Sequence, residues 1–239
     1  MIFGSPHHHH EVTDSTNLRA KELAAGGAPS GTVVTASEQT AGRGRGDRVW
    51  TAPPGAALLY SAILRPLDLG HLLLPLAVPL AVCEACESLA PVRCEVKWPN
   101  DVWIEQRKLA GVLIEARPPD WAVIGVGINL SIPDDRFPAE LRWPATSLGH
   151  GVDPERMRTA LDEALADWVS AGPARVREAF SDRDALQGRE LGWEGGPDTG
   201  GGASCRCPWA GCGAAPGRRR RLEPPDPFGY RSGSPSGLS

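Results

Sequence analysis

Residues 121–130 constrain the fold more than any other stretch, because they are apolar along almost their whole length. A strand with one face in water alternates apolar and polar residues, whereas a nearly continuous apolar run is typical of a strand covered on both faces. Gly125 and Gly127 interrupt the run, and glycine inside a strand indicates that another group approaches the backbone. The chain is therefore expected to build a sheet with packed material on both sides of this strand.

The remaining periodicity predicts further elements around that strand. Strands are expected at residues 31–37, 56–64 and 93–97, followed by a hairpin of residues 102–105 and 108–116 with its bend at 106–107. Helices are expected at residues 15–26, 71–89, 154–171 and 174–181. Strands and helices are mixed without strict alternation, so the sequence predicts an α+β fold with a mixed β-sheet packed with helices.

Composition excludes several classes of protein. The net charge of −4 argues against a general nucleic-acid binder. The longest apolar stretch, residues 72–83, contains two prolines and is too short to span a membrane. The N-terminus lacks the basic and apolar regions of a secretory signal, so a cytoplasmic protein is expected.

Both ends of the chain differ from its middle. Residues 1–12, with four consecutive histidines, are expected to be a disordered leader, and the short stretch before Ser15 is expected to cost the sheet an edge strand. The last 52 residues, 188–239, hold 13 glycines and seven prolines but no valine or isoleucine, which predicts a low-complexity, disordered tail. One folded domain, residues 13–187, remains. The abrupt change suggests the hypothesis that the reading frame shifts near residues 196–200, which resequencing the gene would test.

Residues 39–50 form a loop with three glycines and three arginines after a predicted strand. Glycine lets a backbone turn tightly and approach a ligand, and arginine offers planar donors that suit phosphate oxygens. The loop is interpreted as an anion cradle for a nucleotide phosphate; a solvated surface loop is the alternative.

Lysine is scarce, with three lysines beside 22 arginines, so each lysine suggests a task that needs a compact ammonium group. Two of them begin short motifs: Lys-Trp-Pro-Asn-Asp at residues 97–101 and Lys-Leu-Ala-Gly at residues 108–111. Together with Ser-Thr-Asn at 15–17, the glycine and arginine loop and Gly-Val-Gly-Ile-Asn at 125–129, these motifs cover residues 13–130. In this order, the set resembles the biotin protein ligase (biotin–[acetyl-CoA-carboxylase] ligase) family. The match is to its catalytic domain, without an N-terminal DNA-binding domain.

The resemblance implies an ATP-dependent ligase that needs Mg²⁺. Such an enzyme activates biotin as biotinyl-5′-AMP and transfers it to a lysine of a biotin carboxyl carrier protein domain. Carboxylate attack on the α-phosphorus builds negative charge on phosphoryl oxygens, which preorganised cations stabilise. No nucleic-acid or membrane partner is expected, and the protein is expected to be a monomer or a weak homodimer.

The resemblance also implies site residues. The expected catalytic residues are Arg43, Arg45, Arg48, Lys108 and Asp101. The expected biotin contacts are Ser15, Thr16, Asn17, Gln39, Gly42, Arg43, Gly44, Arg45, Lys108 and Gly111. The expected nucleotide contacts are Arg45, Arg48, Trp50, Lys97, Asn100 and Asn129.

Several residues have a second interpretation. Asp101 is expected either to take a proton from the carrier lysine or to hold Mg²⁺. The second interpretation of Ser15 and Thr16 is that they cap a helix. For Lys97 it is a structural ion-pair partner, and for Glu115 it is a solvated side chain.

Two departures from the family pattern leave other functions open. Asp47 stands where the family has glycine, and its carboxylate opposes a phosphate ligand. The small C-terminal β-barrel of the family is degenerate or absent in the low-complexity tail. The alternatives are a catalytically impaired protein that binds biotin or biotinyl-AMP, and a lipoate ligase-like enzyme.

Overall fold

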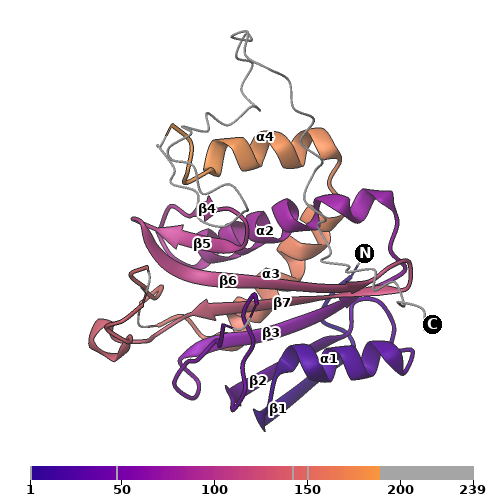
Figure 1. Ribbon diagram of the computed structural model, residues 1–239, viewed down its shortest axis with the longest axis horizontal. Helices are drawn as coiled ribbons and strands as arrows, with labels where there is room; N and C mark the ends of the chain where they lie inside the picture. Colours follow the sequence, from indigo (N-terminus) through magenta and orange to yellow (C-terminus); the bar gives the residue numbers. More distant parts are fainter. Residues whose placement is uncertain (1, 47, 142, 150, 189–239) are drawn as a thin grey trace, which may run out of the picture.

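The computed structural model describes residues 2–46, 48–141, 143–149 and 151–188. Its centre is one seven-stranded sheet in the order β1-β2-β3-β7-β6-β5-β4 (Figure 1). The strands are β1 (His7–Thr13), β2 (Val33–Gln39), β3 (Ala57–Leu64), β4 (Glu95–Lys97), β5 (Asp101–Ile104), β6 (Arg107–Arg117) and β7 (Trp121–Asn129). The α-helices are α1 (Thr16–Ala25), α2 (Leu74–Leu89), α3 (Pro154–Val169) and α4 (Pro173–Arg183), with 3₁₀ turns at Leu69–Leu73 and Asp134–Arg136. The β1–β2 pair is parallel and the other pairs are antiparallel, so the α+β fold with a mixed sheet is confirmed.

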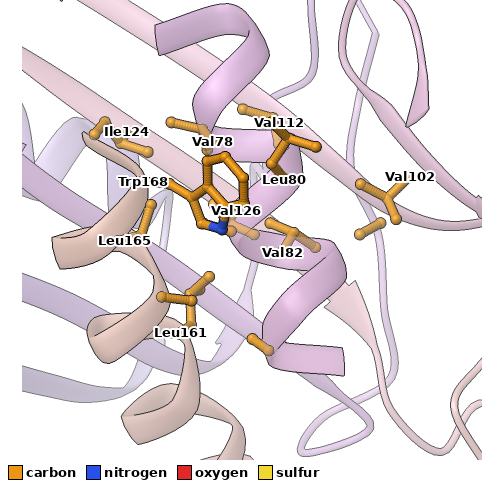
Figure 2. Close-up of a cluster of buried hydrophobic side chains, with 14 of the residues drawn as sticks. Val78, Leu80, Val82, Val102, Val112, Ile124, Val126, Leu161, Leu165 and Trp168 are labelled. Carbon is orange, nitrogen blue, oxygen red and sulfur yellow. The ribbon is translucent and has the colours of Figure 1, made fainter. Parts of the chain in front are cut away.

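Strand β7 is covered on both faces, as its apolar run predicts. It lies between β3 and β6 in the sheet. Ile124, Val126 and Ile128 join the larger core cluster under α2 and α3, whereas Val123 belongs to the smaller cluster under α1. Figure 2 shows side chains of α2 and α3 meeting this larger cluster, with Val78, Leu80, Val82, Leu161, Leu165 and Trp168 on the helices and Val102, Val112, Ile124 and Val126 on the strands.

The segment Leu69–Leu89 is long and apolar enough to cross a membrane by length and composition, with a mean hydropathy of 1.7. In the structure 56% of its most apolar window is buried. Its side chains Val78, Val82 and Cys86 are inaccessible to water and belong to the larger core cluster. We therefore assign it as a core helix of the domain. Cys83 and Cys86 are buried free cysteines, as expected of small core residues.

The expectation of a disordered leader at residues 1–12 is wrong. His7–Thr13 forms edge strand β1, paired in parallel with β2, and Phe3 is buried in the larger core cluster. The imidazoles of His7 and His9 lie 2.8 and 2.9 Å from the hydroxyl of Thr35 on β2. Backbone pairing satisfies strand hydrogen bonds whatever the side chains are, so a run of histidines is compatible with a strand. The expected loss of an edge strand is wrong for the same reason.

The bend of the β5–β6 hairpin lies one residue earlier than predicted, at Glu105 and Gln106. Ile104 pairs with Arg107, which leaves a two-residue loop. Both loop residues have positive φ, 48° and 64°, as hairpin turns that follow the right-handed strand twist require. No glycine or asparagine marks this turn in the sequence, and so the sequence placed it wrongly.

At the C-terminal end, Asp153 caps α3 by accepting a hydrogen bond from the backbone N–H of Arg156 at 2.9 Å, so the helix begins at Pro154, where it was expected. After α4 the backbone N–H of Ala185 donates to the carbonyl of Val96 at 3.0 Å, beside β4. The predictions for residues 189–239, including the tail and the lost barrel, and the prediction for Asp47 lie outside the described residues. The domain boundary at 187 stays a prediction.

Candidate active site

A cavity of about 400 Å³ opens on the face of the sheet that carries α1. Its walls come from the start of α1, the loop after β2 and the facing residues of β3, β6 and β7. The predicted site residues that line it are Ser15, Thr16, Asn17, Gln39, Arg43, Gly44, Arg45, Arg48, Trp50, Asn100, Asp101, Lys108, Gly111 and Asn129. Gly42 and Lys97 do not line it. Residues spread over 115 positions of sequence thus meet at one place.

The start of α1 forms one wall. Ser15 has the extended backbone of an N-cap residue, but its side chain makes no capping hydrogen bond. The backbone N–H and the hydroxyl of Thr16 both donate to the side-chain oxygen of Gln39, at 2.7 and 3.0 Å. These contacts join α1 to the end of β2, so the polar groups at the helix start are fixed toward the cavity rather than used as a cap.

The position of Asn17 is the reason that residue 125 in β7 is a glycine. Its side chain packs against Gly125, where an added Cβ would lie 2.1 Å from the amide oxygen of Asn17. The same oxygen lies 2.6 Å from the hydroxyl of Ser61 on β3. Asn17 is therefore held flat against the sheet, and any residue larger than glycine at 125 would expel it.

Residues 42–46 and 48–50, here named the arginine loop, fold back on themselves. The N–H of Gly44 donates to the carbonyl of Arg48 at 2.7 Å, and the N–H of Trp50 donates to the carbonyl of Gly42 at 3.0 Å. A Cβ at Gly42 would lie 2.2 Å from the carbonyl oxygen of Trp50. Glycine at 42 thus serves the closure of the loop. Gly42 does not line the cavity, whereas its neighbours Arg43 and Gly44 do, and the ligand contacts of all three stay predictions.

Trp50 lies on the floor of the cavity and explains the second glycine of β7. Added Cβ atoms at Gly111 and Gly127 would lie 3.0 and 2.5 Å from its indole ring. The ammonium of Lys108 lies 5.4 Å from the centre of the ring, within cation–π range. Three residues of two motifs, 108–111 and 125–129, therefore meet at the aromatic side chain of a third motif.

Lys108 and Asp101 form an ion pair, with 2.7 Å between the ammonium nitrogen and a carboxylate oxygen. Asp101 is buried, with 4% of its surface exposed, and lies opposite Gly111 on the neighbouring strand. Burial makes such a carboxylate dependent on its cationic partner. The pair holds the lysine ammonium beside the cavity.

Lys97 lies outside the cavity wall. Its ammonium is 5.3 and 5.0 Å from the ring centres of Trp103 and Trp143. Trp103 is buried, whereas Trp98 of the Lys-Trp-Pro-Asn-Asp motif is 48% exposed. Asn129 is buried and donates from its amide to the carbonyl of Thr146 at 3.0 Å.

Sequence reasoning missed part of the site. Phe137, Leu141 and Trp143 line the cavity from the loop after β7, and no periodicity marked them. Glu115 is only 24% exposed and pairs with Lys21 at 2.9 Å, so its interpretation as a solvated side chain is wrong. Its position in the same strand as Gly111, four residues further along, was the available signal, because alternate strand residues share a face.

A dedicated metal site does not appear in the described ranges, which contain no group of three or more His, Cys, Asp or Glu side chains arranged for a metal ion. Asp101 is the one carboxylate among the lining residues that the structure describes, and it is paired with Lys108. The described donor set fits an anion. A divalent cation would therefore need ligands other than protein carboxylates, such as substrate phosphates.

Comparison with known proteins agrees with this geometry. The sequence profile of the biotin/lipoate A/B protein ligase family matches residues 10–129. The chain is 37% identical over 198 residues to the biotin–[acetyl-CoA-carboxylase] ligase of Paracoccus denitrificans, covering 75% of this chain and 81% of that protein. It is 40% identical over 151 residues to the bifunctional ligase/repressor BirA of Bacillus subtilis, covering 60% of this chain and 46% of that protein. The chain thus spans about half the length of the Bacillus protein.

A solved structure gives the same result in three dimensions. The biotin protein ligase of Aquifex aeolicus, in complex with biotin and ATP, is similar with a TM-score of 0.68 and 28% sequence identity. The match covers 78% of this chain and 81% of the Aquifex chain. The likeness therefore extends over most of the chain rather than over one motif.

Proposed function

The chain belongs to the biotin/lipoate A/B protein ligase family, and from this premise we propose that it is a biotin–[biotin carboxyl-carrier protein] ligase. In the proposed reaction the biotin carboxylate attacks the α-phosphorus of ATP, which yields biotinyl-5′-AMP and pyrophosphate. A lysine amine of a carrier domain then attacks the acyl carbon and releases AMP. The named relatives that support this are biotin ligases.

The distribution of charge in the cavity carries the proposal. Four cationic side chains line it, Arg43, Arg45, Arg48 and Lys108, against one described carboxylate that is already paired. An excess of fixed cations suits a reaction in which a carboxylate and a triphosphate meet and negative charge builds on phosphoryl oxygens. The apolar floor of Trp50, Gly111 and Gly127 suits the hydrocarbon part of biotin.

We assign roles by position in the cavity. Ser15, Thr16 and Gln39 form a polar wall that suits the ureido group of biotin. Lys108 is placed to contact the carboxylate and the phosphate between which the new bond forms. The predicted nucleotide contacts Arg45, Arg48, Asn100 and Asn129 line the same cavity, and Lys97 acts from outside it through Trp143. These roles are proposals that substitution tests.

Asp101 has a role beyond the two that its motif suggests. Its ion pair with Lys108 favours a carboxylate that orients the lysine ammonium, and it remains a candidate to accept the proton of the carrier lysine. Mg²⁺ is proposed to enter with the phosphates of ATP, whose charge it neutralises, because the described residues offer no carboxylate cluster for it. We further propose a cytoplasmic location, where ATP and reduced thiols are available.

The deciding experiment incubates the protein with labelled biotin, MgATP and a biotin carrier domain. Label on the carrier is expected for the wild-type protein, and Lys108→Ala should reduce labelling by about 100-fold, because loss of one charged stabilising group in an active site typically costs that much. The matched control is Arg117→Ala, which removes an exposed cation at the end of the same strand and should leave labelling unchanged.

Biotin-dependent exchange between ATP and pyrophosphate separates the alternatives. Exchange without carrier labelling would support the impaired binding protein, which Asp47 and the low-complexity tail suggest. Labelling with lipoate in preference to biotin would support the lipoate ligase-like enzyme. Absence of both exchange and labelling would overturn the proposed ligase.

A further inference from the structure

We propose that Glu115 is a positioning residue that anchors the arginine loop to the sheet through Arg43 and so governs how long biotinyl-AMP stays in the cavity. The inference rests on the proposed function and concerns a residue that does not itself line the cavity. Glu115 follows Gly111 and Leu113 along one face of β6, and both of these line the cavity. It therefore stands at the end of the site, beside the residues that enclose it.

Three donors from two other parts of the chain converge on this one carboxylate. The guanidinium of Arg43 lies 3.2 Å from it, the amide nitrogen of Asn17 3.1 Å and the ammonium of Lys21 2.9 Å. Arg43 belongs to the arginine loop, and Asn17 and Lys21 belong to α1. Because Arg43 and Asn17 both line the cavity, Glu115 fixes two of its walls relative to the sheet.

Glu115 is an anion at neutral pH, as an anchor for a guanidinium must be. Burial raises the pKa of Glu115, but hydrogen bonds from Lys21 and Asn17 and the charges of Lys21 and Arg43 outweigh it, so the pKa lies below its ordinary value. A carboxylate that is only 24% exposed also interacts with its partners more strongly than one in bulk water would.

Among the described residues of the arginine loop, Trp50 and Arg43 both contact the protein body through their side chains. Trp50 packs on Gly111 and Gly127, and Arg43 pairs with Glu115. The guanidinium of Arg48 donates within the loop, to the carbonyl of Arg45 at 3.0 Å. Packing of an aromatic ring on glycine backbone is weakly directional, whereas an ion pair at 3.2 Å fixes the distance between one loop side chain and one strand side chain. The Arg43–Glu115 pair therefore sets the position of the first half of the loop.

Lys21 and Asn17 make this anchor reversible. A half-buried carboxylate that loses its only partner is strongly unfavourable. Here Lys21 and Asn17 stay on Glu115 if Arg43 moves away, because both belong to α1 and not to the loop. The loop can thus release a product without leaving an unpaired charge behind.

The test combines Glu115→Gln, Arg43→Ala and the double variant, with two readouts. In the ligand-free protein, the rate of trypsin cleavage after Arg45 and Arg48 reports how firmly the loop is held. With biotin and MgATP, the release rate of biotinyl-AMP and the KM for biotin report its function. Glu115→Gln is expected to raise the cleavage rate, the release rate and the KM by about fivefold, as loss of one partly exposed ion pair would, with kcat changing less than twofold.

The double variant is expected to behave like Arg43→Ala alone, since the two residues act through one contact. The matched control is Glu87→Gln, which removes a carboxylate of similar exposure paired with Arg183 away from the cavity. It should lower stability and leave loop cleavage unchanged.

Any one of three results would overturn the proposed anchor. The first is an unchanged rate of loop cleavage in Glu115→Gln, and the second is an equal increase in that rate in Glu87→Gln. The third is an effect in the double variant that is the sum of the two single effects. If the wild-type protein forms no biotinyl-AMP, the proposed function fails. The cleavage readout needs no ligand, so it still decides whether Glu115 anchors the loop.

Discussion

Single side chains decide the shape of the cavity, and the glycines of β6 and β7 are where this is most visible. Gly111 and Gly127 leave room for the ring of Trp50, and Gly125 leaves room for Asn17. Each glycine is thus matched to one larger side chain from a distant part of the sequence. The floor of the site depends on these pairs, because the sheet backbone cannot move away without breaking its ladders.

Gly127→Ala should displace Trp50 from the floor. The added methyl carbon would lie 2.5 Å from the indole ring, which is too close for any carbon contact. We expect about 10-fold slower biotin-dependent ATP–pyrophosphate exchange, since misplacing a group that orients substrate weakens catalysis to this degree or more. The control is Gly172→Ala, where an added Cβ meets nothing within 4 Å. Equal exchange rates for the two variants would contradict the role of Trp50.

The strands and helices differ in how clearly the sequence predicts them. Strand β7 and helix α3 carry strong signals, a nearly continuous apolar run and an Asp153-Pro154 start, and both lie where predicted. Strand β1 carries none, because four of its seven residues are histidines. Its formation depends on the free edge of β2 and on Phe3, which is buried in the larger core cluster.

Phe3→Ala tests whether residues 2–12 are an integral part of the fold. Only 5% of the Phe3 surface is exposed, and truncation of a buried phenylalanine should lower the free energy of unfolding by about 2–4 kcal/mol. The neighbouring Ile2 is 79% exposed, so Ile2→Ala should change the free energy of unfolding by less than about 0.5 kcal/mol. Urea denaturation of both variants measures this difference in the free energy of unfolding. Equal free energies for the two variants would support the interpretation of a disordered leader.

A cluster of charged side chains joins α4 to α2 and to the edge of the sheet. The guanidinium of Arg183 on α4 donates to both carboxylate oxygens of Glu87 on α2, at 2.6 and 2.8 Å. The backbone N–H of Cys94, just before β4, donates to the same carboxylate at 2.8 Å. One carboxylate thus links α2, α4 and the edge of the sheet.

This cluster makes part of the stability of the domain depend on pH. Burial raises the pKa of Glu87, but the bonds from Arg183 and Cys94 outweigh it and the pKa lies below its ordinary value of 4.5. A depressed folded-state pKa contributes stability that is present above the unfolded pKa and is lost as the pH falls through the folded pKa.

Glu87→Gln should therefore lower Tm at pH 7 by about 2–4 °C, the shift that ~1 kcal/mol gives in a domain of this size. The difference should shrink as the pH falls below the ordinary value of 4.5 and through the lowered folded-state pKa, because the wild-type carboxyl then becomes protonated too. Calorimetry of both proteins between pH 3 and 7 measures this. A difference that stays constant over that range would show that the lost charge is not the cause.

Much of this protein follows from local pattern. The mixed sheet and helices α1 to α4 were predictable, because burial of strands and the start and stop signals of helices leave marks on consecutive residues. Half of the residues that line the cavity were expected, and they came from the resemblance of five short motifs to a known family. Strand β1, the bend at Glu105 and the partners of Glu115 were not predictable. They depend on a free strand edge, on the twist of a hairpin and on charges brought together from α1, the arginine loop and β6. Such contacts join residues far apart along the chain, and they exist only once the sheet has placed those residues side by side.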